Sequence, residues 1–117
     1  MKDEYIARRK QYIRKKVYNK WTDTEVLLLS SLEIRFYKKL EEIGAKWLKP
    51  SYITYVTDDG VSHRYFSDFY LPDTDQYIET KGYYWPSDKT KMSLVQIQNP
   101  KLNIKILFDK DIEQWCP

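Results

Sequence analysis

The stretch between residues 63 and 83 constrains the fold most, because two alternating aromatic runs flank a turn signal. His63 to Leu71 alternates and is rich in Tyr and Phe, and Tyr77 to Tyr83 has a similar character. The intervening Pro-Asp-Thr-Asp, at positions 72–75, is typical turn chemistry. The sequence therefore predicts a β-hairpin here, and the fold must contain a sheet.

Three charged residues of this hairpin have a suggestive placement. Side chains two residues apart in a strand share a face, so Glu79 and Lys81 point to one side while Ile78 and Thr80 point to the other. If the two strands pair in the natural register, Asp68 can lie near Glu79 on the same face. The hairpin thus brings two carboxylates and one ammonium group together.

Two desolvated carboxylates repel each other, and a divalent cation such as Mg²⁺ or Mn²⁺ removes this cost. Mg²⁺ is typically held by one or two carboxylates together with substrate phosphate, and the Thr80 backbone carbonyl can serve as a third protein ligand. Lys81 could then position an attacking water or stabilise the transition state of phosphodiester hydrolysis. The alternative is that Asp68, Glu79 and Lys81 only form the solvated face of the hairpin.

Several short motifs follow one another in fixed order along two-thirds of the chain. They read Ser-Ser-Leu-Glu (30–33), Ser-Asp-Phe-Tyr-Leu-Pro (67–72), Ile-Glu-Thr-Lys-Gly (78–82), Ser-Asp-Lys-x-Lys (87–91) and Asn-Pro-Lys-Leu-Asn-Ile-Lys-Ile-Leu-Phe (99–108). In order and spacing they resemble the PD-(D/E)xK nuclease superfamily, and within it the phage endonuclease I family of Holliday-junction resolvases. The resemblance implies a restriction-endonuclease-like core and a metal-dependent DNA endonuclease.

The resemblance also implies residue roles. Asp68 and Glu79 match the metal-binding acids of the family, Lys81 matches its catalytic lysine, and Glu33 matches an additional active-site acid. Ser67 stands where the family motif has proline, which only restrains the backbone there. Resolvases of this family carry more sequence after the core, so the resemblance supports nuclease chemistry more strongly than junction specificity.

Glu33 has a second interpretation from the residues alone. Ser30 and Glu33 are spaced as a capping box, with Ser30 as the N-cap and Glu33 at the third helical position. The spacing favours this capping role, whereas the family resemblance favours a role in the active site.

The charge of the chain is uneven. The net charge is +3, yet residues 1–20 contain eight Lys or Arg against two acidic residues. Apolar positions between residues 3 and 19 have the spacing of a helical stripe. This pattern predicts a basic helical arm that contacts DNA or forms a dimer, although its charges could simply face solvent. The expected DNA contacts in the arm are Arg8, Arg9, Lys10, Arg14, Lys15 and Lys16.

The remaining elements complete an α/β (α+β) prediction, a mixed central sheet flanked by helices. Residues 1–29 are expected to be the helical arm, with a second helix capped by Thr22, and residues 30–117 the nuclease core. The core should contain a helix over 31–43 that stops at Gly44, a strand ending at Val56, a turn at 58–60, a helix capped by Ser87 or Asp88 that runs to Gln98, and a strand over 104–108. Lys89 and Lys91, in the first turns of that later helix, are further candidates for DNA binding.

Several classes of function and location are disfavoured by composition. A single histidine, His63, argues against histidine-based zinc sites and serine-type triads, and a single cysteine, Cys116, excludes an internal disulfide. The sequence has no Gly-rich phosphate loop, so we expect no nucleotide cofactor. The longest aliphatic run, Val26–Leu29, is too short for a membrane span, and no signal peptide is evident. We expect a cytoplasmic protein encoded by a phage or a bacterium.

The sequence thus predicts an endonuclease that uses Mg²⁺ or Mn²⁺ to hydrolyse DNA. The resemblance suggests branched DNA as the substrate and a homodimer as the working form. Two alternatives remain: a site-specific nicking or homing endonuclease of the same superfamily, and a DNA-binding module that has the fold but does not cut.

Overall fold

The computed structural model describes residues 12–117. Within this range the elements follow the order β1 (Tyr12–Asn19), β2 (Thr24–Ser30), α2 (Ser31–Ile43), β3 (Ile53–Val56), β4 (Ser62–Tyr65), β5 (Phe69–Leu71), β6 (Gln76–Lys81), α3 (Pro86–Gln98), β7 (Ile104–Phe108) and α4 (Asp109–Ile112). The described part of the chain is therefore a mixture of helices and strands, as the sequence predicted.

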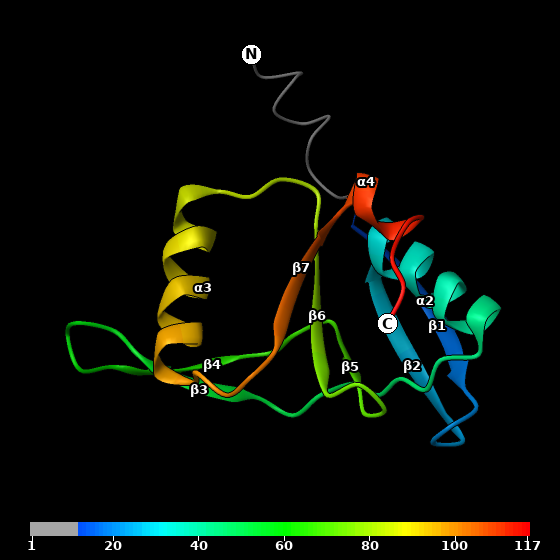
Figure 1. Cartoon of the computed structure of the whole chain (residues 1–117), viewed down its shortest axis with the longest axis horizontal. Helices are drawn as coiled ribbons and strands as arrows, with labels where there is room; N and C mark the ends of the chain where they lie inside the picture. The colour runs from blue at the N-terminus through cyan, green and yellow to red at the C-terminus, as the bar shows by residue number, and fades with distance from the viewer. Residues whose placement is uncertain (1–11) are drawn as a thin grey trace, which may run out of the picture.

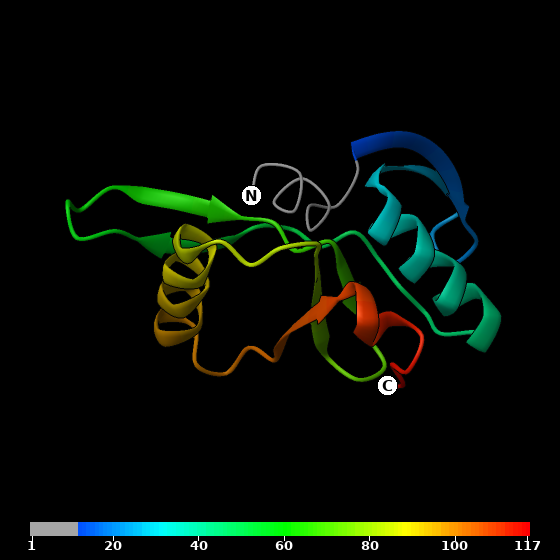
Figure 2. The ribbon, with the colours of Figure 1, turned by 90° about the horizontal axis from the view of Figure 1, so that it is seen from above.

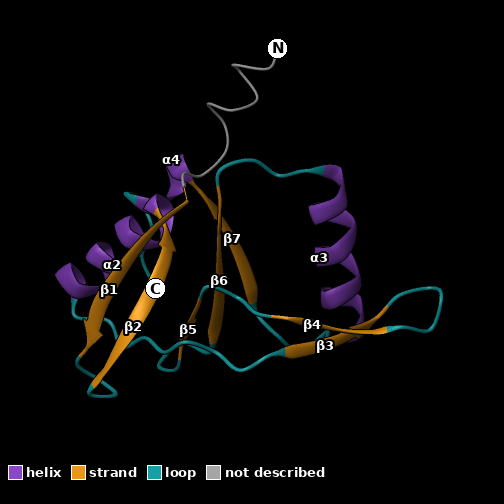
Figure 3. Ribbon diagram, turned by 180° about the vertical axis from the view of Figure 1, so that it is seen from behind, coloured by secondary structure: helices purple, strands orange, loops and turns teal. Residues whose placement is uncertain are grey.

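The strands form three small sheets in the described residues: the hairpin β1–β2, the hairpin β3–β4, and a three-stranded sheet in the order β5–β6–β7. In the last sheet β5 pairs antiparallel with β6, and β7 runs parallel to β6. This mixed sheet lies in the middle of the molecule (Figure 1), with β1–β2 and α2 on one side and β3–β4 and α3 on the other. The same arrangement is visible from behind in Figure 3.

The helical arm was a wrong prediction for residues 12–29, which form the β1–β2 hairpin; residues 1–11 lie outside the described range. The apolar spacing fitted a helix, but Val17 faces Val26 across the hairpin, and both contribute to the core beneath α2. Cross-strand packing of β-branched residues therefore overrides the weak local helical signal. The division into an arm and a core remains a prediction.

The supposed second helix start is instead the turn of this hairpin. Asp23 adopts a left-handed backbone with φ of 54°, and its carboxylate accepts a hydrogen bond from the Tyr18 hydroxyl at 2.7 Å. Asn19 accepts from the Trp21 N–H at 2.9 Å and is itself buried, donating to the Trp47 carbonyl. Asn and Asp make such turns at low cost, so Thr22 begins no helix here.

Helix α2 was predicted correctly at both ends. Ser30 is the N-cap, and its hydroxyl accepts from the Glu33 N–H at 3.2 Å. Gly44 ends the helix with φ of 70°, a left-handed conformation that favours glycine. The helix buries Phe36 and Leu40 completely in a core that it shares with the hairpin and the central sheet.

The predicted strand from His63 to Leu71 is in fact two strands. Ser62–Tyr65 pairs with β3 as β4, whereas Phe69–Leu71 pairs with β6 as β5. The chain changes partner over Phe66–Asp68, where Asp68 donates its N–H to the Ile78 carbonyl at 3.0 Å. The second half of the predicted hairpin was correct, because Phe69 faces Ile78 and Leu71 faces Gln76 across the 72–75 turn.

The C-terminal half contains the predicted helix and strand. Helix α3 begins at Pro86, after the N-cap Trp85, so the cap lies two or three residues before the predicted Ser87 or Asp88. It lies against the β3–β4 hairpin, as Figure 2 shows from above. Strand β7 matches the predicted 104–108, while the short helix α4 after it was not foreseen. No helix in the described residues is long and apolar enough to cross a membrane.

Candidate active site

Asp68 lies beside the C-terminal end of β6, one residue before β5 begins. Its Oδ2 accepts hydrogen bonds from both the backbone N–H and the hydroxyl of Thr80, each at 2.8 Å. The carboxylate thus occupies the position where a neighbouring strand would otherwise offer a carbonyl. A strand residue points its N–H and C=O toward the same neighbour, so the Thr80 carbonyl faces the side on which Asp68 lies.

Glu79 is the residue of β6 directly before Thr80, and its side chain is buried, with 7% of the residue exposed. Its Oε1 accepts a hydrogen bond from the Tyr65 hydroxyl at 2.8 Å. Burial and the adjacent Glu79 charge raise the pKa of Tyr65 well above its ordinary value of 10.0, so this hydroxyl keeps its proton and remains a donor. The Glu79 carboxylate is therefore fixed in place from the end of β4.

Lys81 lies between two carboxylates. Its Nζ is 3.6 Å from Oε2 of Glu79, on the same face of β6, and 3.5 Å from Oδ1 of Asp88 in the first turn of α3. Only 18% of the Lys81 side chain is exposed, so the ammonium group is held in a restricted position. The predicted pairing of Glu79 and Lys81 on one face is confirmed by this contact.

Glu33 reaches the same region through Lys49. Glu33 is 6% exposed, and its Oε2 accepts from the Leu29 N–H at 3.1 Å and lies 3.8 Å from the Lys49 Nζ. Lys49 also donates to the Asp68 carbonyl at 2.8 Å. Lys49 thus joins Glu33, at the start of α2, to the backbone of Asp68. Glu33 therefore bonds the N-cap Ser30 through its N–H and is linked to Asp68 through Lys49.

The donor atoms of this cluster suit a hard divalent cation. Glu79 belongs to β6, and the Asp68 carboxylate is bound to the next residue of that strand, Thr80. The Thr80 carbonyl is an additional oxygen. Among residues 12–117, no group of three or more His, Cys, Asp or Glu side chains could hold a metal by itself. Mg²⁺ does not require such a group, because one or two carboxylates suffice when phosphate and water complete its coordination.

The basic residues predicted to contact DNA fall into three groups. Arg8, Arg9 and Lys10 lie outside the described residues, whereas Arg14, Lys15 and Lys16 are exposed on β1. Because successive strand residues point to opposite faces, Lys15 and Lys16 lie on opposite faces of the β1–β2 hairpin. On α3, the Lys89 Nζ lies 5.8 Å from the centre of the Tyr84 ring. The Lys91 Nζ lies 5.2 Å from the centre of the ring of Tyr65, the residue that donates to Glu79.

Sequence reasoning missed three residues that contact the cluster: Lys49, Tyr65 and Asp88. Tyr65 had a detectable signal, because it is an apolar position of the alternating strand that leads directly to Asp68. Asp88 was considered only as a helix cap, although its carboxylate also contacts Lys81; it does accept from the Trp85 N–H at 3.4 Å. Nothing local marks Lys49, since its contacts depend on how residues 44–52 cross the edge of the sheet.

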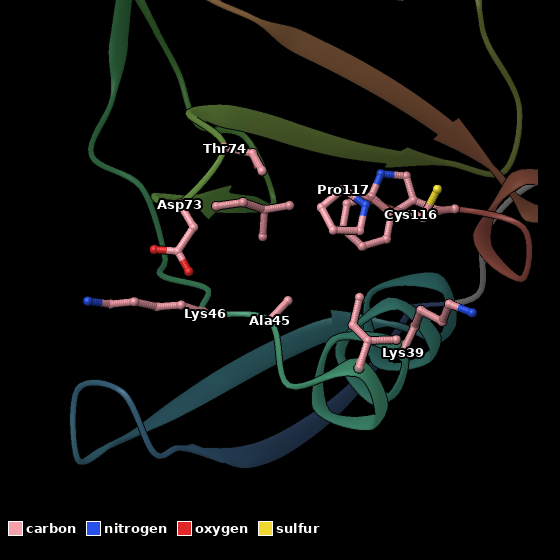
Figure 4. A pocket seen from close by; sticks show the side chains of 10 residues that line it. Lys39, Ala45, Lys46, Asp73, Thr74, Cys116 and Pro117 are labelled. Carbon is pink, nitrogen blue, oxygen red and sulfur yellow. The ribbon is translucent and has the colours of Figure 1, made fainter.

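A pocket of about 350 Å³ opens elsewhere, between the C-terminal end of α2, the 72–75 turn and the last residues of the chain. Figure 4 shows Lys39, Ala45, Lys46, Asp73, Thr74, Cys116 and Pro117 around it. Its lining contains none of the acidic residues or lysines of the cluster described above. The candidate active site is the partly buried cluster at the C-terminal end of β6, and it lies outside this pocket.

Comparison with known proteins decides the family. The sequence model of the phage endonuclease I family matches residues 11–114. The chain belongs to this family. It is 34% identical over 79 residues to endonuclease I of Escherichia phage T7, which covers 68% of this chain and 52% of that protein. It is 38% identical over 80 residues to endodeoxyribonuclease 1 of Enterobacteria phage T3, which covers 68% of this chain and 51% of that protein.

The chain therefore spans about half the length of the curated relatives that it matches. No solved structure matches it. The matched range of the family model includes every element that builds the cluster, from Glu33 on α2 to Asp88 on α3.

Proposed function

We propose that this protein is a metal-dependent endodeoxyribonuclease of the PD-(D/E)xK type. The observation that carries the proposal is the arrangement at the C-terminal end of β6. Glu79 and Lys81 are in contact on one face of the strand, and Asp68 is hydrogen-bonded to Thr80, the residue between them in the sequence. Membership of the phage endonuclease I family supports it, and the two relatives named above are called an endonuclease and an endodeoxyribonuclease.

In this proposal Asp68, Glu79 and the Thr80 carbonyl hold Mg²⁺ or Mn²⁺. When bound, the metal supplies Lewis-acid polarisation of the phosphate and activation of water. Thr80 keeps the Asp68 carboxylate in place, and Tyr65 does the same for Glu79. Both acids are thus preorganised before DNA arrives, so little reorganisation is needed in the transition state.

Lys81 carries the positive charge of the reaction centre. Held between Glu79 and Asp88, its ammonium can donate to a phosphate oxygen or to the water that attacks in line with the leaving oxygen. Glu33 is linked to the Asp68 carbonyl through Lys49, and in this proposal it is an additional active-site acid.

Branched DNA is the proposed substrate, and a homodimer is the proposed working form, because cutting two opposed strands of a junction needs two active sites. The exposed cations of β1 and α3 would bind the phosphate backbone. We place this activity inside the infected or encoding cell, where such DNA is found.

Cleavage assays with a four-way junction and a linear duplex of the same sequence test the proposal. We expect the wild type to cut the junction with Mg²⁺ or Mn²⁺ and not in EDTA. Lys81→Ala should lose a factor of roughly 10²–10³ in rate, as loss of one transition-state donor does elsewhere. Lys105→Ala, which changes an exposed lysine of β7, is the matched control and should cut normally.

The two rival functions have distinct outcomes in this assay. Equal cutting of junction and duplex would reject branch recognition and favour a nicking or homing endonuclease. Binding without cutting by the wild type, with either metal, would identify a DNA-binding module that lacks activity.

A further inference from the structure

The outer face of the β3–β4 hairpin carries exposed aromatic residues. The hairpin is antiparallel with Ile53 opposite Tyr65, so the register continued by one step places Tyr52 opposite Phe66. Side chains alternate along it, and the inner face, which includes Ile53 and Tyr65, packs with Met92 of α3. The opposite face, formed by Tyr52, Thr54, Val56, Ser62, Arg64 and Phe66, is exposed.

Three of these residues form one cluster, here called the aromatic platform. The rings of Tyr52 and Phe66 lie edge to face with their centroids 6.2 Å apart. The Arg64 guanidinium lies over the Tyr52 ring at 4.3 Å. Tyr52 is 47% exposed and Phe66 is 59% exposed, so two large rings remain in contact with water although the hairpin has a buried face. Adjacent exposed rings of this kind mark binding surfaces more often than scattered apolar residues do.

Along the chain the platform adjoins the proposed active site, and it lies on the face of the hairpin opposite Tyr65, whose hydroxyl contacts Glu79. Phe66 precedes Asp68 by two residues, so their Cα atoms are at most about 7 Å apart, roughly two steps along one strand of duplex DNA. The charge of the hairpin is also polarised. Its cation, Arg64, lies near the Asp68 end, whereas Asp58 and Asp59 lie at the far turn. A polyanion is therefore favoured at the active-site end.

We propose that the aromatic platform stacks with unpaired nucleobases of the DNA substrate close to the phosphate that is cut. This inference rests on the proposed nuclease function and deepens it, because it supplies a way to tell a branch from an intact duplex. A base inside a duplex must be unpaired and unstacked, at a cost of a few kcal/mol, before it reaches the rings, whereas a base that a branch leaves unpaired costs less. Stacking with aromatic rings tolerates any base sequence.

The arrangement fits a base better than a protein partner. Arg64 covers one face of Tyr52 and can reach a phosphate, while Phe66 is the more exposed of the two aromatic residues. A ring for stacking next to a guanidinium is the combination that binds single-stranded nucleic acid. A second copy of this chain is the competing occupant, and the experiment below separates the two.

The test compares Phe66→Leu, which keeps an apolar side chain but removes the ring, with Phe66→Trp, which keeps a ring. Both change an exposed residue, and circular dichroism verifies folding. Val61→Ala, at the exposed far end of the hairpin, is the control. Binding is measured with a four-way junction and with linear duplex in a Ca²⁺ buffer without Mg²⁺ or Mn²⁺. Photo-crosslinking from 5-iodouracil at the branch then maps the contact in the wild type.

We expect Phe66→Leu to bind the junction roughly tenfold more weakly, with unchanged duplex binding, since one base stack is worth about that factor. Phe66→Trp and Val61→Ala should bind like the wild type, and the crosslink should fall on Tyr52 or Phe66. Equal junction affinity of Phe66→Leu and wild type would overturn the proposal. So would a change in sedimentation behaviour without a change in DNA binding, which would assign the face to self-association.

Failure of the nuclease proposal gives a different result. If the wild type binds neither DNA, or never cuts when Mg²⁺ is restored, the proposed function is rejected before any variant is compared. If the wild type cuts the junction and Phe66→Leu binds it normally, only the aromatic platform is rejected.

Discussion

Tyr65→Phe removes one hydroxyl from the centre of the candidate site and leaves its ring in place. Tyr65 is 2% exposed and Glu79 is 7% exposed, so water cannot easily replace the 2.8 Å hydrogen bond between them. The variant leaves the buried Glu79 carboxylate with one donor fewer. We expect both stability and activity to fall, because the same contact stabilises the fold and orients a proposed metal ligand.

The size of the stability effect follows from the kind of bond. A buried hydrogen bond to a charged group contributes about 1.5–3 kcal/mol. For a chain of 117 residues, an unfolding entropy of about 2.1 cal/mol/K per residue converts this to a fall in Tm of roughly 6–12 °C. Lys81 remains 3.6 Å from the other oxygen of Glu79, which favours the lower half of that range.

A double-mutant cycle isolates the contact. Urea denaturation of wild type, Tyr65→Phe, Glu79→Ala and the double variant gives the coupling free energy between the two side chains. We expect coupling of about 1.5 kcal/mol or more, because neither single change leaves the bond intact. Cleavage by Tyr65→Phe should fall roughly tenfold or more, in the range seen when partners of metal ligands are removed.

Coupling below about 0.5 kcal/mol would refute the reasoning, since it would mean that the two side chains are effectively independent. Tyr55→Phe is the matched control. It also removes a hydroxyl from a tyrosine on the inner face of the same hairpin, and the Tyr55 ring stacks on His63. It should cut DNA like the wild type.

Other consequences can be measured separately. Lys49→Met should reduce cleavage roughly tenfold with little change in DNA affinity, because it removes the link between Glu33 and the Asp68 carbonyl; unchanged rates would exclude a positioning role. Gly44→Ala should destabilise the fold by about 1 kcal/mol or more in chemical denaturation, because an L side chain is strained at φ of 70°. Lys16→Gln should lower the slope of log affinity against log salt by about 0.9 if it contacts one phosphate, and an unaltered slope would remove it from the interface. The raised pKa of Tyr65 means that the folded state keeps a proton which the unfolded chain loses above the ordinary tyrosine pKa of 10.0. The stability should therefore be steady below pH 10.0 and fall above it. This fall should be shallower in Tyr65→Phe.

The parts of the fold that were predictable from sequence carry strong local signals. Helix α2 has a Ser cap at one end and a glycine at the other, and β7 is a mostly apolar run that only Lys105 interrupts. The Glu79–Lys81 pair was predictable because side chains two apart on a strand must share a face. In each case one short segment contained all the information needed.

The features that were missed depend on partners far away in the sequence. Val17 belongs to a strand because Val26 and α2 cover it, and nothing within residues 12–19 specifies that. The split of the 63–71 run depends on β3 offering a partner to its first half and β6 to its second. Lys49 enters the site only because the chain crosses the edge of the sheet at that point.

Locating Mn²⁺ by anomalous scattering in crystals soaked with the metal tests the central claim most directly. The account predicts one strong peak bounded by the carboxylates of Asp68 and Glu79, and its loss in Asp68→Asn. A crystal that binds Mn²⁺ elsewhere and shows no peak beside Asp68 and Glu79 would contradict it.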